Sequence, residues 1–235
     1  MPTDPIIVAL DYDEAEQALQ LVAQIKDYLR FFKVGSQLFT REGPAFIRQL
    51  RHLGVDVFLD LKFHDIPETV RKAVRAAAAL DVRFLTIHAS GGPAMIEAAL
   101  KGAEGTATTV LGVTVLTSMD ESSLRATGQE RTPGEHVLLL AAMAQKAGLK
   151  GLVCSPLEIA PIRERLGRDL LLVTPGIRGA ADRKGDQKRT LSAEEALCLG
   201  ADHLVIGRPI TEAPNPAAAA AALVAAIPAS APSGK

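Results

Sequence analysis

The segment LDLKFHDIPETV, from Leu59 to Val70, places four ionisable side chains in or just after a run of apolar residues. The apolar residues are typical of a buried strand, yet Asp60 and Lys62 lie within it, and His64 and Asp65 follow it. Burying an unpaired charge costs several kcal/mol. These groups must therefore either pair with one another or bind a charged ligand.

Asp60 and Lys62 are two residues apart, and side chains alternate between the two faces of a strand. We therefore expect both charges to point into one space, while Leu59 and Leu61 face the opposite way. Lys33 ends an earlier apolar run and is expected to lie beside Asp60. Neighbouring carboxylates favour the charged form of lysine, so Lys62 is predicted to be a positioned proton donor rather than a free amine for a Schiff base.

Other interpretations of these charges remain open. The Asp and Lys side chains could form a purely structural ion pair. Asp11, Asp60 and Asp65 could bind magnesium, although the two interleaved lysines would compete with the metal. His64 and His88 are as suited to capping backbone groups as to moving a proton, and no two histidines have metal-ligand spacing.

Eight short runs rich in Val, Ile and Leu recur along the chain, each followed by a longer segment with helical spacing. The predicted strands are Ile6 to Leu10, Phe31 to Val34, Val55 to Leu61, Phe84 to His88, Val110 to Val115, Gly151 to Val153, Leu170 to Thr174 and Leu204 to Ile206. The predicted helices are Ala15 to Tyr28, Pro44 to Leu53, Pro67 to Leu80, Ala94 to Gly102, Glu135 to Ala147, Glu158 to Leu166, Ala193 to Leu199 and Pro216 to Ala226.

This order predicts an α/β fold, a single-domain (β/α)8 TIM barrel over residues 1–227, with a doubly wound open sheet as the alternative. Residues 228–235 are rich in Ala, Pro and Ser and are predicted to be a disordered tail. Two pairs, Asp13 with Glu16 and Ser192 with Glu195, are expected to cap helix N-termini. Three glycines are expected to end helices in a left-handed conformation: Gly54, Gly148 and Gly200.

Composition favours a globular protein with a local, rather than a general, affinity for anions. Hydrophobic residues make up 48% of the chain and charged residues 23%, as in ordinary folded domains, and the net charge of −1 offers no broad attraction to nucleic acid or membranes. Two cysteines are too few for a disulfide framework. With no apolar run of spanning length and no basic region before the first apolar stretch, we expect neither a membrane helix nor a signal peptide, and a cytoplasmic location.

In a barrel of this kind, active sites lie at the C-terminal ends of the strands, and nearly every predicted strand here ends in polar residues. Solvent also begins at strand ends, so for any single residue this placement is weak evidence. The residues concerned are Asp11, Lys33, Asp60, Lys62, His88, Thr117, Ser118, Pro175 to Arg178, Gly207 and Arg208.

The segment GIRGAADRKGDQKR, from Gly176 to Arg189, is long and highly charged for a connection between elements. It follows the seventh predicted strand, and IGRPIT follows the eighth. Loops at these two positions usually hold phosphate in this fold. Arg178 and Arg208 are therefore candidate phosphate ligands and the long segment is a candidate lid, unless it is only a solvated surface loop.

Between about Ile6 and Thr211 the chain resembles the orotidine 5'-phosphate decarboxylases of the short bacterial type. The motifs that carry the resemblance follow one another along the chain as ALD, FKVG, LDLKFHDIPETV, VLTSM, PGIR, DQKR and IGRPIT. The Asp-x-Lys-x-x-Asp core is shared with magnesium-dependent sugar-phosphate lyases and decarboxylases, which remain the alternative. A nucleotide sensor without catalytic activity is a further alternative. The resemblance implies decarboxylation to uridine 5'-phosphate, the last step of de novo pyrimidine nucleotide synthesis, without metal or organic cofactor.

The resemblance also implies a role for each matched residue. Lys62 would protonate carbon 6 of the pyrimidine, with Asp60 beside the substrate carboxylate and with Lys33 and Asp11 holding the ribose hydroxyls. Asp65 and Thr69 would enter the active site of a partner subunit in a homodimer with shared sites. The remaining implied contacts are Thr117 and Ser118 with the pyrimidine, Gln187 between lid and ligand, Arg178 at the base of the lid, and Gly207 and Arg208 with phosphate.

Overall fold

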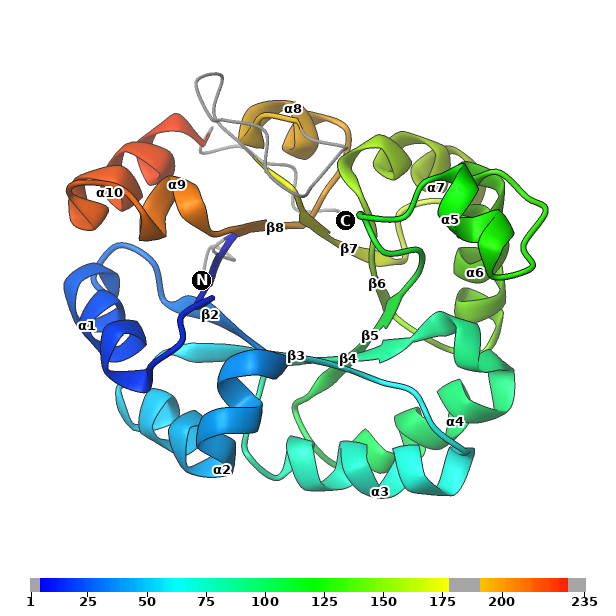
Figure 1. Cartoon of the computed structure of the whole chain (residues 1–235), viewed down its shortest axis with the longest axis horizontal. Helices are drawn as coiled ribbons and strands as arrows, with labels where there is room; N and C mark the ends of the chain where they lie inside the picture. The colour runs from blue at the N-terminus through cyan, green and yellow to red at the C-terminus, as the bar shows by residue number, and fades with distance from the viewer. Residues whose placement is uncertain (1–4, 178–190, 228–235) are drawn as a thin grey trace.

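The computed structural model describes residues 5–177 and 191–227, and its strands form a closed parallel barrel in sequence order inside a ring of helices (Figure 1). The strands are β1 (Ile6–Ala9), β2 (Phe31–Gly35), β3 (Asp56–Phe63), β4 (Phe84–His88), β5 (Thr109–Val113), β6 (Gly151–Val153), β7 (Leu171–Pro175) and β8 (His203–Ile206). The predicted (β/α)8 barrel is confirmed. The open-sheet alternative is wrong, because β1 pairs directly with β8 through Ile6 and Leu204.

Most helices lie where the 3.6-residue pattern predicts them. The helices are α1 (Ala15–Ile25), α2 (Ser36–His52), α3 (Pro67–Ala78), α4 (Gly92–Ala103), α5 (Glu121–Ala126), α6 (Pro133–Lys146), α7 (Ile159–Leu166), α8 (Ala193–Cys198), α9 (Arg208–Thr211) and α10 (Pro216–Ala226), with 3-10 turns η1 (Ala89–Gly91) and η2 (Pro156–Glu158). Within residues 5–177 and 191–227, no helix combines the length and apolar character needed to cross a membrane.

The sequence prediction missed the first part of α2 and the two short helices α5 and α9. We expected α2 to begin at Pro44, but its helical turns begin at Ser36 and continue past a kink at Gly43, whose φ is 67°. A proline at the start of a helical turn is the usual sign of an N-terminus, and here it marks the restart after the kink. The short helices α5 and α9 have too few residues for a periodic pattern.

One of the two predicted N-terminal caps is wrong and the other is confirmed. Helix α1 begins at Ala15 without a side-chain cap, and Asp13 instead accepts a hydrogen bond from Gln37. At α8, the Ser192 amide donates to Glu195 Oε2 at 2.9 Å and the Glu195 amide donates to Ser192 Oγ at 3.2 Å, a complete capping box. The three predicted helix-ending glycines all have positive φ: Gly54, Gly148 and Gly200.

The barrel has an apolar interior and a larger apolar layer between strands and helices. Along β1, Ile7 and Ala9 face the interior, and Ile6 and Val8 face the helices. The interior residues are Ile7, Ala9, Phe31, Phe58, Phe84, Leu111, Val173 and Val205. Because this packing fills the barrel, polar side chains are left to gather at its mouth, where the strands end.

Candidate active site

A cavity of about 890 Å³ opens at the C-terminal ends of the strands. Its wall is contributed by residues of, or just after, β1, β2, β3, β5, β6, β7 and β8. The residues predicted from the sequence that line it are Asp11, Lys33, Asp60, Lys62, Thr117, Pro175, Gly176, Ile177, Gly207 and Arg208. Residues far apart in the chain therefore meet in one site.

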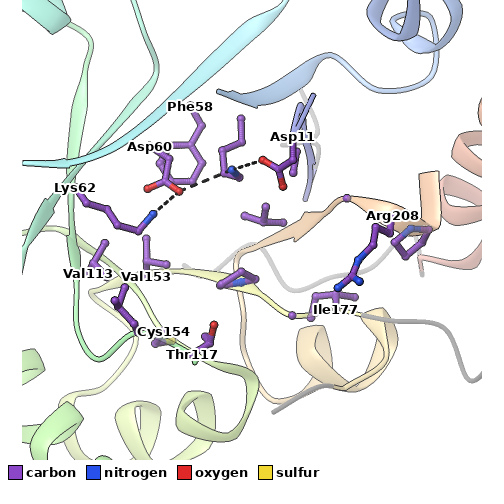
Figure 2. Close-up of a pocket in the computed structure, with 18 of the residues that line it drawn as sticks. Asp11, Phe58, Asp60, Lys62, Val113, Thr117, Val153, Cys154, Ile177 and Arg208 are labelled. Atoms are coloured by element: carbon purple, nitrogen blue, oxygen red, sulfur yellow. Dashed lines mark hydrogen bonds and ion pairs between the residues drawn. The ribbon is translucent and has the colours of Figure 1, made fainter. Parts of the chain in front are cut away.

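Four charged side chains form an alternating row along one wall of this cavity (Figure 2). Lys62 Nζ donates to Asp60 Oδ2 at 2.7 Å, and Lys33 Nζ lies 3.9 Å from the same oxygen. Lys33 Nζ also donates to Asp11 Oδ1 at 3.1 Å. The row of Lys, Asp and Lys expected from the sequence is present, and Asp11 extends it at one end.

Asp60 is the most enclosed acid of the row, with 13% of its side chain exposed. Burial by itself would raise its pKa, but the charges of Lys33 and Lys62, with hydrogen bonds from Lys62 and Thr86, outweigh burial and hold the pKa below its ordinary value. Asp60 is therefore a carboxylate at neutral pH. Any negatively charged ligand group placed beside it would have to be held there by the neighbouring lysines.

The end of β3 departs from the regular alternation that we used to place Asp60 and Lys62. Leu59 pairs with Leu85 and Phe63 pairs with Ile87, so the register with β4 shifts within this segment. Lys62 itself has a φ of 52°, which is rare for a residue with a side chain. Asp60 and Lys62 do reach the same cavity, but a local irregularity, rather than an even strand, brings their side chains together.

The side of the cavity where the sequence predicts phosphate binding is formed by the segments that follow β7 and β8. Figure 2 shows Arg208 across the cavity from Lys62 and Asp60, with Ile177 beside it. Gly207 also lines this side, and a Cβ there would point toward Ala9 and Asp11, at 3.6 and 3.9 Å. Arg178 and Gln187, together with the rest of the candidate lid at 178–190, lie outside the described residues.

Three other predicted site residues do not line the cavity of the single chain. Ser118 is exposed beside Thr117, which does line it. Asp65 and Thr69 belong to the exposed stretch at 64–69 that leads from β3 into α3. Asp65 Oδ1 accepts a hydrogen bond from the Ile66 amide at 2.6 Å, and the Ile66 side chain is 68% exposed.

The two histidines considered in the sequence lie next to each other near Lys62, with ring centroids 5.8 Å apart. The pKa of His88 is lowered, first by its partial burial and then by the nearby His64 and Lys62. His88 is thus a neutral imidazole at neutral pH, and it is a poor proton donor compared with the Lys62 ammonium.

The magnesium site considered from Asp11, Asp60 and Asp65 is not assembled. The Lys33 ammonium lies between Asp11 and Asp60, and Asp65 is outside the cavity wall. Across residues 5–177 and 191–227, no three His, Cys, Asp or Glu side chains come together in a way that could hold a metal ion.

Sequence reasoning missed two side chains at this site. Thr86 of β4 hydrogen-bonds both Asp60 and the Lys62 backbone; strand alternation within FLTIH could have pointed to it. Cys154 lines the cavity just after β6. Burial, followed by the charge of Glu158, raises its pKa to about 12, so its thiol stays protonated and is a poor nucleophile.

The sequence of this chain matches a known protein family. The model of the "Orotidine 5'-phosphate decarboxylase / HUMPS family" matches residues 4–223. A curated orotidine 5'-phosphate decarboxylase from Nitrosococcus oceani is 49% identical over 97% of this chain and 99% of its own. The corresponding protein from Halorhodospira halophila is 51% identical over 94% of this chain and 95% of its own.

Solved structures agree with the sequence comparisons. A crystal structure of orotidine 5'-phosphate decarboxylase from Lactobacillus acidophilus superposes with a TM-score of 0.84 at 40% identity, covering 93% of this chain and 96% of that one. An uncharacterized conserved protein from Geobacillus kaustophilus superposes with a TM-score of 0.82 at 37% identity, covering 93% and 98%. The chain belongs to the orotidine 5'-phosphate decarboxylase / HUMPS family.

Proposed function

We propose that this protein decarboxylates orotidine 5'-phosphate to uridine 5'-phosphate and carbon dioxide, as the last step of de novo uridine 5'-phosphate synthesis. The observation that carries the proposal is the row Asp11, Lys33, Asp60 and Lys62 in a cavity that also contains Arg208. Family membership and relatives about half identical over nearly the whole chain support the same activity.

The chemistry asks for a cation close to one carbon atom of the pyrimidine ring. Loss of carbon dioxide without an electron sink leaves a carbanion in the plane of the ring, and a positioned positive charge followed by prompt protonation can stabilise it. Lys62 meets both requirements, because its ammonium is held by Asp60 at 2.7 Å while 33% of its side chain stays exposed in the cavity. In this proposal Lys62 protonates carbon 6, and Asp60 lies beside the departing carboxylate.

The rest of the cavity would hold the substrate at a distance from the reacting carbon. Lys33 and Asp11 would bind the ribose hydroxyls, and Thr117 and Ser118 the pyrimidine. The proposed ligands of the phosphate are Gly207 and Arg208, with Arg178 and Gln187 added by the segment at 178–190. Binding energy from the remote phosphate can be used to assemble the reacting end of the site.

A homodimer with shared active sites forms part of this proposal. Asp65 and Thr69 would complete the site of the partner subunit. Three observations support this arrangement: Asp65 and Thr69 are exposed in the single chain, the neighbouring Ile66 is 68% exposed, and neither Asp65 nor Thr69 lines the cavity of its own chain. We also propose that the protein works in the cytoplasm, where its nucleotide substrate would be made.

A direct assay tests the activity. Purified protein is mixed with orotidine 5'-phosphate in the presence of EDTA, and the loss of substrate absorbance is followed together with formation of uridine 5'-phosphate. We expect full activity with EDTA. Absence of turnover would refute the proposal, and activity that is lost with EDTA and restored by magnesium would instead favour a metal-dependent lyase.

A further inference from the structure

Thr86, in the middle of β4, joins the two residues at the centre of the charged row. Its side chain is fully buried, with 0% exposed. The Lys62 backbone amide donates to Thr86 Oγ1 at 2.9 Å, and Thr86 Oγ1 donates to Asp60 Oδ1 at 2.8 Å. One hydroxyl therefore contacts the carboxylate of one residue and the backbone of the other.

The contact with Lys62 occurs where β3 and β4 stop pairing regularly. Between Leu59 and Phe63 the register shifts, and Lys62 takes a left-handed φ of 52°. The partly buried Lys62 amide has left the regular strand ladder and needs another acceptor, and the Thr86 hydroxyl is that acceptor. It thereby holds in place a backbone conformation that a residue with a side chain seldom adopts.

The contact with Asp60 determines which carboxylate oxygen faces the lysines. An ionised carboxylate only accepts hydrogen bonds, and a hydroxyl has one proton to donate, so the direction of this bond is fixed. With Oδ1 bonded to Thr86, Oδ2 is the oxygen that faces Lys62 Nζ at 2.7 Å and Lys33 Nζ at 3.9 Å. The same hydroxyl thus restrains both ends of the Asp60 and Lys62 pair.

We propose that Thr86 is a positioning residue that aligns the Lys62 ammonium for proton transfer by fixing the Asp60 carboxylate and the Lys62 backbone together. The inference rests on the proposed decarboxylation. Thr86 does not line the cavity and so acts through its two neighbours. Its loss should lower the rate of the chemical step more than the affinity for nucleotide, because the proposed phosphate ligands lie elsewhere.

Three variants separate positioning from structural support. Thr86→Val removes the hydroxyl at nearly constant shape, and Thr86→Ser keeps the hydroxyl but removes a methyl group. Thr108→Val is the matched control, because Thr108 is also buried and donates a hydrogen bond, to the Val82 carbonyl at 2.7 Å, but it precedes β5 at the other end of the barrel.

For Thr86→Val we expect kcat to fall roughly 10- to 100-fold, the range for losing a hydrogen bond to a charged group. Binding of uridine 5'-phosphate should change by less than about threefold. Thr86→Ser should recover most of the rate. Thr108→Val should keep the wild-type kcat even if its melting temperature falls as much as that of Thr86→Val. Equal kcat values in Thr86→Val and Thr108→Val would overturn the inference.

Crystal structures of the wild type and Thr86→Val provide a readout that does not depend on turnover. We expect the variant to show a rotated Asp60 carboxylate or a changed Lys62 φ, and an unchanged arrangement would also count against positioning. If the wild-type protein fails to decarboxylate orotidine 5'-phosphate, the proposed function is refuted, while these structures still decide whether Thr86 fixes the pair.

Discussion

At the scale of single residues, Lys62 combines features that are seldom found together. Its ammonium is paired with the enclosed carboxylate of Asp60, its side chain is one-third exposed to the cavity, and its backbone is left-handed. A purely structural ion pair needs neither the exposure nor the unusual backbone. Unfavourable backbone conformations persist where the surroundings enforce them, and they gather at functional sites.

The first prediction concerns the Lys62 side chain itself. Lys62→Ala should lower kcat by at least about 1,000-fold, because it removes both the proton donor and the charge that stabilises the carbanion. Binding of uridine 5'-phosphate, measured by calorimetry, should remain detectable. Lys146→Ala, at an exposed position of α6, is the control and should be fully active. A near-normal rate for Lys62→Ala would exclude it as the proton donor.

The second prediction concerns how stability depends on the ionisation of Asp60. Its folded-state pKa lies below the ordinary value of 3.8, so its ionisation stabilises the fold above that pH, and this contribution is lost as pH falls through the lower folded pKa. The free energy of unfolding in urea is compared between the wild type and Asp60→Asn at about pH 5, where Asp60 is ionised in both the folded and the unfolded state, and at lower pH. Below about pH 4 the free energy of unfolding of the wild type should fall relative to that of Asp60→Asn. A difference that stayed the same from about pH 5 to about pH 3 would contradict this assignment.

At the scale of elements, the close packing of α3 against α4 positions the segment that leaves β3. These helices lie side by side on the outside of the barrel (Figure 1). Gly102 of α4 makes this approach possible, since a Cβ there would lie 2.5 Å from the Arg71 carbonyl oxygen and 3.0 Å from Val74 Cβ. Thr69 lies in the first turn of α3, and Asp65 lies two residues before the first residue of the helix.

The third prediction follows from this packing. Gly102→Ala should destabilise the protein by about 1–3 kcal/mol, because the backbone carbonyl of Arg71 must move to admit the methyl group. Gly134→Ala, in α6, meets nothing within 4 Å and should be neutral or up to about 1 kcal/mol more stable. Urea unfolding measures the stability of both variants. Equal stability would show that the contact at Gly102 does not limit how closely α3 and α4 approach each other.

At the scale of the whole molecule, one chain supplies the cavity and the charged row but leaves Asp65 and Thr69 outside the wall. The exposed stretch at 64–69 lies directly after the strand that carries Asp60 and Lys62. A second copy of the chain is the partner that we propose for this stretch. Each active site would then need residues from both chains.

The fourth prediction is complementation between inactive variants. Lys62→Ala and Asp65→Ala should each be inactive or nearly so, yet after mixing and subunit exchange, hybrid dimers should contain one intact site. If exchange is complete and random, about half of the dimers are hybrids, and they should recover roughly a quarter of the wild-type activity. Mixing two differently tagged samples of Lys62→Ala is the control. No recovery despite exchange, shown by co-purification of the two tags, would place Asp65 outside the partner's site.

The sequence by itself determined the barrel, its strands and which charged residues would share one cavity. Apolar runs of strand length alternate with helical spacing because every parallel strand of a barrel is buried between its interior and its helices. The same topology brings all strand ends to one rim, so Asp11, Lys33 and Asp60 could be grouped before any distance was known. Local patterns did less well where the chain is irregular, as at the kink of Gly43 and at the uncapped start of α1.

Only the tertiary structure decided how the charged side chains of the segment LDLKFHDIPETV, from Leu59 to Val70, are arranged. Strand alternation places Asp60 and Lys62 on one face, but a shift in register and a left-handed residue set their actual geometry, and neither can be read from one strand alone. Strand alternation within FLTIH could have pointed to Thr86, but its two hydrogen bonds could not be predicted, because its hydroxyl meets Asp60 and Lys62 only in the folded barrel. The low pKa of Asp60 likewise depends on Lys33, Lys62 and Thr86 surrounding one buried carboxylate, an arrangement that exists only when β2, β3 and β4 are side by side.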